Sequence, residues 1–235
     1  MINGVFISVV IPTLNEADYV QASVKQFTNH VKKNFFEVIV VDGGSHDGTA
    51  DLAAKAGAMV ITNAPKNRAS QMNMGAAQAT YPILYFVHAD VIVPEKFYND
   101  ILKALSAGEE AGCYRSGFKY YPGLMRINAF VTRFKWLTAR GGDQTLFITK
   151  TIFQELKGFD ESYTIMEDYD IIKRIWATGK KFTILPNKVV ISLRKYKNNS
   201  WLRVQYANAT AMIMFSRGYS ADQIKTKYQK LINPA

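Results

Sequence analysis

The chain has 235 residues, of which 48% are hydrophobic, so it is long enough for one large α/β domain or two small ones around a packed core. Its single cysteine, Cys113, excludes an internal disulfide, favours a reducing compartment and is expected to be a packing residue. The N-terminal segment has no basic stretch and no small-residue cleavage site, so no signal peptide is expected. Because the apolar runs are too short to span a bilayer, we expect a cytoplasmic protein.

The net charge of +10 is concentrated near the C-terminus. Residues 173–235 hold 13 of the 29 lysines and arginines but a single acid, Asp222, whereas the preceding part has a slight acidic excess. Such a tail is either a solvated basic surface or the contact to an anionic group: lipid headgroups, an anionic acceptor or a diphosphate. A peripheral position at the inner face of the membrane is therefore one expected location.

In the first hundred residues, predicted strands and helices alternate with short links. This alternation is typical of a parallel, doubly wound sheet, in which ligands bind at the carboxyl ends of strands. Asn15 or Thr13 is placed to cap the first helix. The predicted strands are 5–11, 36–41, 59–62 and 83–87, and the predicted helices are 17–32, 49–56, 70–79 and 94–106.

The second half of the chain has a less regular pattern. We find no repeat and no linker, so we expect one α/β domain, residues 1–190, with a basic helical extension, residues 191–235, packed on it. The predicted strands are 112–121, 144–149 and 182–185, and the predicted helices are 124–139, 151–156, 169–178, 201–217 and 221–231.

Two predicted strands end in polar residues that suit a nucleotide. After the first strand, polar side chains either hydrogen-bond a base or ribose or cap the next helix. The second strand ends in a carboxylate that suits a base N–H or a ribose hydroxyl, and the glycine after it lets the backbone approach a ligand. The spacing matches neither the dinucleotide fingerprint nor the P-loop. The candidate nucleotide-binding residues here are Pro12, Thr13, Asn15, Glu16, Asp42 and Gly43.

Two further segments are candidates for the donor phosphates and a metal ion. Arg68 precedes a small-residue helix and either pairs with phosphate oxygens or lies at the surface, and Gln71 on that helix joins the predicted nucleotide site. The fourth strand leads into His88, Ala89 and Asp90. Asp90 is the predicted ligand for Mg²⁺ or Mn²⁺, with substrate phosphates completing the shell. His88 either ligates the metal, forms a hydrogen bond near it, or has a structural role. Ala89 is a candidate nucleotide-binding residue.

An acidic cluster, Glu167 and Asp168, stands just before a predicted helix. Acids at a helix N-terminus are expected from capping and dipole effects alone. The functional interpretation is that Asp168 is the general base toward an acceptor hydroxyl, with Glu167 supporting it or contacting the acceptor.

These segments, in this order over residues 5–180, resemble glycosyltransferase family 2, enzymes of the GT-A fold. The resemblance is carried by VVIPTLNE, VIVVDGGSHDGT, a strand that ends in an Asp-containing motif, GFDE and an ED pair. The segments NRASQMNMGA, FVHAD, GGDQTLFI and ISLRKY, the last followed by Trp201, also resemble a subgroup described as arsenosugar-biosynthesis or radical-SAM/selenodomain-associated transferases.

The resemblance implies a mostly parallel twisted sheet flanked by helices, and transfer with inversion from a UDP- or GDP-linked sugar to an acceptor hydroxyl. It places Asp168 as the base and Gly142 and Asp143 at the donor sugar and acceptor. The family's metal motif is usually Asp-x-Asp, whereas here His88 stands in the first position and only Asp90 matches. The second protein contact to the metal is therefore open, and the sequence names no acceptor.

Two rival functions remain at this point. A nucleotidyltransferase is expected to have a glycine-rich loop with basic residues after the first strand, which the segment PTLNE lacks. A binding module without catalysis would use the basic C-terminal part to contact RNA or a lipid surface. Because the chain has no nucleic-acid motif, we expect no nucleic-acid partner.

Overall fold

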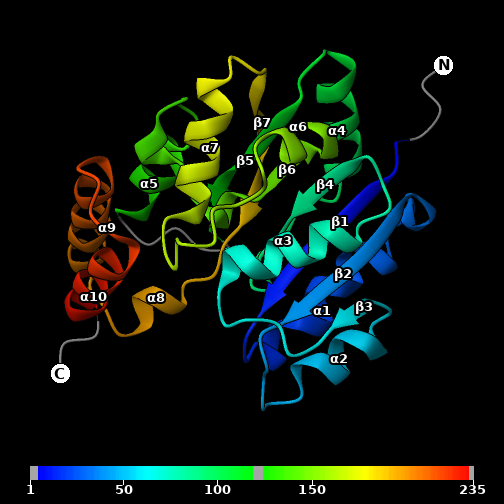
Figure 1. Ribbon diagram of the computed structural model, residues 1–235, viewed down its shortest axis with the longest axis horizontal. Coiled ribbons are helices and arrows are strands. Elements are labelled where there is room, and N and C mark those ends of the chain that lie inside the picture. The colour runs from blue at the N-terminus through cyan, green and yellow to red at the C-terminus, as the bar shows by residue number, and fades with distance from the viewer. Residues whose placement is uncertain (1–4, 119–123, 233–235) are drawn as a thin grey trace.

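The computed structural model describes residues 5–118 and 124–232 and has a twisted seven-stranded sheet at its centre (Figure 1). The strands are β1 (Ile7–Thr13), β2 (Phe36–Asp42), β3 (Met59–Ile61), β4 (Ile83–Phe86), β5 (Ala111–Gly117), β6 (Leu146–Thr149) and β7 (Phe182–Val190). Their order in the sheet is β3-β2-β1-β4-β6-β5-β7. Only the pairs that β6 makes with β4 and β5 are antiparallel, so the predicted mostly parallel α/β sheet is confirmed.

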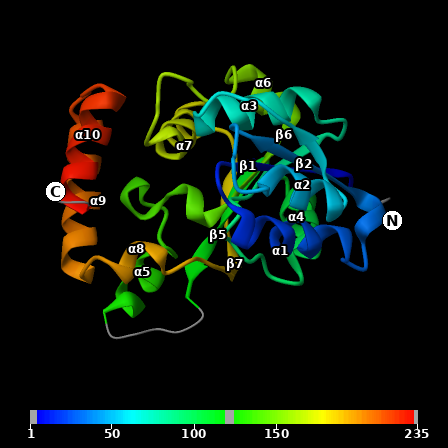
Figure 2. The same ribbon diagram turned by 90° about the horizontal axis from the view of Figure 1, so that it is seen from below.

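Helices cover both faces of this sheet, as Figures 1 and 2 show. The helices are α1 (Ala17–Thr28), α2 (Thr49–Lys55), α3 (Arg68–Gln78), α4 (Phe97–Ser106), α5 (Met125–Val131), α6 (Lys150–Glu155), α7 (Glu167–Ala177), α8 (Arg194–Lys197), α9 (Trp201–Ser216) and α10 (Ala221–Ile232), with 3₁₀ turns η1 (Lys33–Phe35), η2 (Leu137–Ala139) and η3 (Gly142–Gln144). One apolar core contains residues of α1, α2 and α4, and the other contains residues of α3, α6 and α7.

The two cores follow from the alternation of side chains along the strands. In β1, Val9 and Ile11 belong to one core and Val10 to the other, and all three are fully buried. On the α3 side, Gly75 lies directly against Val10, because a Cβ atom at this glycine would overlap the valine side chain. This close packing of α3 on β1 fixes the helix that carries the NRASQMN segment.

The predicted cap of the first helix is wrong. Neither Thr13 nor Asn15 caps α1, and Asn15 itself adopts the left-handed conformation with φ of 55°. Instead, the backbone N–H of Ala17 donates to Asp47 Oδ2 at 3.1 Å. Because β1 and β2 pair in parallel and end together, the loop after β2 lies close enough to supply this acceptor.

The predicted helix 124–139 is also wrong, because it is interrupted after α5. The buried guanidinium of Arg140 donates through Nη2 to the carbonyl oxygens of Thr132 and Phe134, at 2.5 and 3.0 Å. These carbonyls are thereby satisfied without a continuous helix. The short helix α8 was not predicted, and the end of the predicted strand 112–121 lies outside the described residues.

The last two helices lie side by side at the end of the molecule opposite β3 (Figure 1). Phe215 of α9 and Ile224 of α10 pack with Met166, which directly precedes α7. None of the helices in the described part of the chain has the length and apolarity that a bilayer crossing requires.

Candidate active site

Candidate residues from distant parts of the chain meet where several strands end at one edge of the sheet. Since β6 is antiparallel to β4, its first residue, Leu146, pairs with Phe86 at the end of β4. This pairing places η3 beside the loop that follows β4. His88 Nδ1 accordingly lies 3.7 Å from Asp143 Oδ1, although the two residues are far apart in the chain.

A second crossing brings Arg194 over the same edge. Ile92, after β4, and Val190, at the end of β7, exchange backbone hydrogen bonds of 2.8 and 2.9 Å. The chain beyond β7 therefore passes over the loop that carries Asp90. Arg194 donates to both carboxylate oxygens of Glu16 at 2.9 Å, and its Nε lies 3.1 Å from Asp90 Oδ2. One guanidinium thus bridges two of the predicted site carboxylates.

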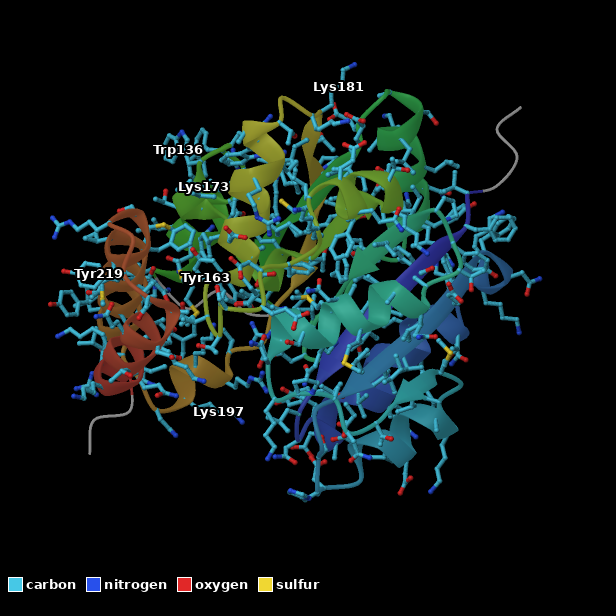
Figure 3. The ribbon with its side chains drawn as sticks, viewed as in Figure 1. Trp136, Tyr163, Lys173, Lys181, Lys197 and Tyr219 are labelled. Atoms are coloured by element: carbon cyan, nitrogen blue, oxygen red, sulfur yellow. The ribbon has the colours of Figure 1, made fainter. Side chains whose placement is uncertain are left out.

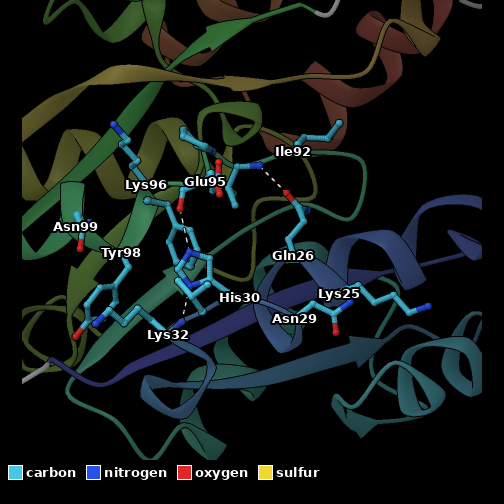
Figure 4. Close-up of a pocket in the computed structure, with 14 residues that line it drawn as sticks. Lys25, Gln26, Asn29, His30, Lys32, Ile92, Glu95, Lys96, Tyr98 and Asn99 are labelled. Carbon is cyan, nitrogen blue, oxygen red and sulfur yellow. Dashed lines mark hydrogen bonds between the residues drawn. The ribbon is translucent and has the colours of Figure 1, made fainter.

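The loop carrying Asp90 is held from behind by α1. Figure 4 shows Gln26 bonded to this loop at the edge of a cavity of about 520 Å³ between α1 and the start of α4. Gln26 Nε2 donates to the Val91 carbonyl at 3.1 Å, and the Val93 N–H donates to Gln26 Oε1 at 2.7 Å. These two bonds keep the loop in place without occupying the face that Asp90 presents to Arg194.

Lys195, next to Arg194, makes a second ion pair in the site. Its Nζ lies 3.7 Å from Asp143 Oδ2. The Lys195 ammonium, aided by the nearby His88 imidazole, lowers the pKa of the Asp143 carboxyl well below its usual range. Sequence reasoning assigned residues 191–235 to a basic extension that contacts an anionic group, and it did not name Arg194 or Lys195 as site residues. Their signal was the basic charge of this part of the chain.

The predicted base lies in the first turn of α7, beside a buried ion pair. Glu167 is buried, and its Oε1 accepts a hydrogen bond from Nη1 of the half-exposed Arg68 at 3.0 Å. Burial, together with the adjacent Glu167 carboxylate, raises the pKa of Asp168 to about 6. Asp168 therefore has the properties of a proton acceptor near neutral pH.

The segment before α7 is clamped to α3 by side-chain hydrogen bonds. Asn73 Nδ2 donates to the Phe159 carbonyl and Asn73 Oδ1 accepts from the Phe159 N–H, both at 2.9 Å. Ser70 Oγ donates to Glu161 Oε2 at 2.7 Å. The NRASQMN and GFDE segments, read separately in the sequence, thus bind each other and set the position of the acidic turn.

We predict that Asn73→Ala lowers the free energy of unfolding by about 1–3 kcal/mol, because it leaves the peptide N–H and C=O of Phe159 without these partners. Urea denaturation followed by circular dichroism measures the change. The matched control is Gln78→Ala, an exposed position on the same helix that is expected to change stability little. Equal unfolding midpoints for the two variants would contradict the clamp.

The polar residues after β1 and β2 are tied into one connected group. Asp42 accepts hydrogen bonds from the N–H groups of Gly44 and Ser45 at 3.1 and 2.8 Å, and from Thr13 Oγ1 at 3.2 Å. Gln71 Nε2 donates to the Thr13 carbonyl at 3.3 Å. Asp42 and Gln71 are both buried, so their hydrogen bonds fix the conformation of the loops at the ends of β1 and β2.

Two apolar residues among the predicted nucleotide contacts, Pro12 and Ala89, are buried as well. The Ala89 side chain packs in the apolar core behind the sheet edge, so only its backbone faces the loop. Pro12 is buried within β1, opposite Val41 of β2. Gly43 has no room for a side chain, since a Cβ atom there would overlap Gln71 Nε2.

Five further candidates line a pocket of about 310 Å³: Arg68, His88, Asp143, Glu167 and Asp168. Asn15 lies outside this pocket, and its backbone N–H donates to Ser45 Oγ at 2.8 Å. The lining of this pocket does not include Glu16, Asp42 or Asp90. Glu16 and Asp90 instead pair with Arg194, the chain neighbour of the pocket residue Lys195. Gly142 begins η3 directly before Asp143. The pocket residues that carry charge, an imidazole or a phenol are Arg68, His88, Arg140, Asp143, Glu167, Asp168, Tyr169, Lys195 and Tyr228.

Comparison with known proteins identifies related chains. The glycosyltransferase AglE of Haloferax volcanii is 33% identical over 92 residues, which are 36% of this chain and 30% of AglE. A PGL/p-HBAD biosynthesis glycosyltransferase of Mycobacterium bovis is 27% identical over 207 residues, 80% of this chain and 77% of that protein. This chain therefore spans less than a third of the length of AglE.

The fold matches a solved glycosyltransferase structure. The mannosyltransferase PcManGT from Pyrobaculum calidifontis, in complex with GDP-Man and Mn²⁺, superimposes with a TM-score of 0.71 at 18% identity, covering 98% of this chain and 70% of that one. The sheet is therefore of the GT-A type. Since the model of glycosyl transferase family 2 matches residues 8–163, more than half of the sequence, this chain belongs to that family.

Proposed function

We propose that the protein is a metal-dependent, inverting glycosyltransferase that moves a sugar from a UDP- or GDP-linked donor to an acceptor hydroxyl. The observation that carries this proposal is the pocket in which Asp168, with its raised pKa, lies near Asp143 and Lys195 and beside the Glu16–Arg194–Asp90 group. Membership of glycosyl transferase family 2 favours sugar transfer over the rival nucleotidyltransferase and binding-module interpretations.

Asp168 is proposed to accept the proton of the acceptor hydroxyl as that oxygen attacks the anomeric carbon. The attack and the departure of the nucleoside diphosphate occur in one displacement, so the configuration at this carbon inverts. Arg68 holds the Glu167 carboxylate in an ion pair, so this carboxylate does not turn toward the base, Asp168. Asp143, held by Lys195 and His88, is placed to orient the donor sugar or the acceptor.

For the donor, we propose that the group formed by Thr13, Asp42 and Gln71 shapes the nucleotide site and that Glu16 contacts the ribose or base. Arg194 and Lys195 add two positive charges where a diphosphate is expected, which favours the anionic donor and leaving group.

The site also fits a divalent cation. The described residues contain no group of three or more potential ligands, so protein ligands alone would not saturate the ion. Asp90 and Glu16 nevertheless bind one positive charge together, the Arg194 guanidinium. A typical Mg²⁺ or Mn²⁺ site has one or two protein carboxylates, and phosphate oxygens of the substrate complete the coordination shell. We propose Asp90 as the ligand. When bound, the ion supplies electrostatic stabilisation of the departing diphosphate.

We further propose membership of the arsenosugar or radical-SAM-associated subgroup, because its segments NRASQMN, FVHAD and GGDQ converge here: Arg68, His88 and Asp143 line one pocket. Residues 1–190 are proposed as the catalytic domain and 191–235 as an extension packed on it. The β7–α8 segment of that extension supplies Arg194 to the site.

A thermal-shift screen of UDP, GDP, ADP and CDP, each with and without Mn²⁺ or Mg²⁺, tests the proposal. We expect stabilisation by UDP or GDP that depends on the metal, followed by sugar transfer with inverted configuration in NMR spectra of the product. A protein that no nucleoside diphosphate stabilises under any of these conditions would refute the proposed function.

The pH dependence of transfer follows from the raised pKa of Asp168, about 6. Because the base works only when deprotonated, kcat is expected to be constant well above pH ~6 and to fall about tenfold per unit below it. Initial rates at saturating donor between about pH 4.5 and 8 measure this limb, with donor binding followed at each pH. A kcat that stays level down to about pH 4.5 contradicts Asp168 as the base.

A further inference from the structure

A groove of about 610 Å³ adjoins the candidate catalytic pocket, between α5, the β7–α8 segment and α9. The groove and the pocket share Asp143, Tyr169 and Lys195 in their walls. A molecule in the groove is therefore able to reach the pocket with one end. The volume lies within the range of roughly 300–1,000 Å³ that is usual for small-molecule sites.

The walls of the groove away from the pocket are largely apolar and aromatic. They include Phe118, Val131, Ile191, Val204 and Met212. Water gains few hydrogen-bond partners along such walls, whereas an apolar chain placed there is removed from solvent. The groove therefore favours a hydrocarbon body over a second sugar ring.

The apolar surface continues from the groove to the outside of α9 and α5. Leu202, Tyr206 and Ile213 are spaced by four and seven residues, so they share one face of α9, and they are 69%, 63% and 50% exposed. On α5, Ile127 and Phe130 are 53% and 51% exposed. Ile127 and Ile213 also line the groove. A compact ligand confined to the groove would leave the apolar side chains of this outer face exposed to water.

Exposed basic side chains lie on the same elements as this face or next to them. Arg126 and Arg133 of the α5 region and Arg203 of α9 are exposed, and Lys197 extends from α8 at the same end of the molecule (Figure 3). A second copy of the chain would present the same positive charges and be repelled. An anionic bilayer, in contrast, is complementary to an apolar face with a basic rim.

We propose that the acceptor is a membrane lipid with a free hydroxyl on its headgroup. Its hydrocarbon chain occupies the groove, its hydroxyl enters the pocket of Asp168, and the α5–α9 face rests on an anionic bilayer. This proposal rests on the proposed function and adds to it the chemical class of the acceptor.

The membrane contact is tested by co-sedimentation with phosphatidylcholine vesicles, with and without phosphatidylglycerol. Wild type should bind only the anionic vesicles, and Leu202→Glu/Tyr206→Glu should lower the partition coefficient about tenfold or more, because two apolar contacts are lost and two like charges are added. Met59→Glu, a 47% exposed apolar position on the far edge strand β3, is the control and should bind as wild type does. Equal binding by the double variant and wild type overturns the contact.

The groove is tested with n-alkanols from butanol to decanol as probes, by their competition with transfer or by thermal shift. Affinity should rise roughly fourfold per added methylene in the wild type. In Ala209→Phe, which fills the groove from an exposed position, that increment should disappear. An affinity independent of chain length in the wild type overturns the lipid acceptor.

Nucleoside diphosphate binding with Mn²⁺, measured on the same preparations, separates the two proposals. If the variants and wild type bind nucleotide equally while the alkanols show no chain-length dependence, the lipid acceptor is wrong and the proposed transferase function stands. If the wild type binds the alkanols but no nucleotide, the proposed function is wrong.

Discussion

Asp168→Asn is expected to lower kcat about 10²–10⁴-fold, the usual contribution of a general base, while the dissociation constant of the donor changes little. Asparagine has nearly the same shape as aspartate but cannot accept the proton. The carboxylate is also not part of the Arg68–Glu167 ion pair, so that pair should survive the change. Single-turnover transfer and donor titration, measured on the same variant, separate the chemical step from binding.

Asp170→Asn is the matched control for this experiment. It makes the same chemical change in the same turn of α7, but Asp170 forms its ion pair with Arg174 at 2.6 Å. Asparagine keeps an oxygen that can accept the hydrogen bond of Arg174 Nε, so this variant should stay folded and its kcat should be close to the wild-type value. If both variants lose activity equally, the acids of this turn are structural. Near wild-type turnover by Asp168→Asn would remove Asp168 from the role of base.

Local patterns in the sequence were sufficient for the frame of the site. Apolar runs with short polar links predict β1, β2 and β4, and a parallel sheet then requires that Thr13, Asp42 and the loop of Asp90 share one edge. The acidic first turn of α7 was similarly visible, because its carboxylates directly precede the helical pattern that begins at Tyr169.

Patterns of this kind do not show which loops meet. The bridge between Ile92 and Val190 joins segments almost a hundred residues apart, and it is this bridge that places Arg194 over Asp90. The Asn73–Phe159 clamp is likewise a contact between segments far apart in the chain, which no local pattern predicts. The break in the helix predicted from 124 to 139 depends on one buried side chain, Arg140, that overrides local propensity.

The second large effect is expected from Asp90→Ala, which should weaken nucleoside diphosphate binding in the presence of Mn²⁺ on the order of 100-fold, because a proposed metal ligand contributes several kcal/mol. Without Mn²⁺, the variant and wild type should bind nucleotide about equally. Isothermal titration with and without the metal measures both values. Asp51→Ala, an exposed carboxylate on α2, is the control that should keep the metal effect. A metal effect that persists in Asp90→Ala excludes this residue as the ligand.

Arg194→Gln is expected to strengthen the binding of Mn²⁺ in the absence of nucleotide, whereas Asp90→Ala removes a metal ligand. In the structure its guanidinium lies 3.1 Å from Asp90 and bonds Glu16, so a divalent cation must compete with a positive charge already held there. Removing that charge should strengthen Mn²⁺ binding to the nucleotide-free protein, which the loss of the free Mn²⁺ signal in electron paramagnetic resonance measures directly. The same change should weaken donor binding, since one of the two cations available to the diphosphate is lost. Weaker Mn²⁺ binding by Arg194→Gln would mean that the arginine holds the two carboxylates in the arrangement that the metal needs.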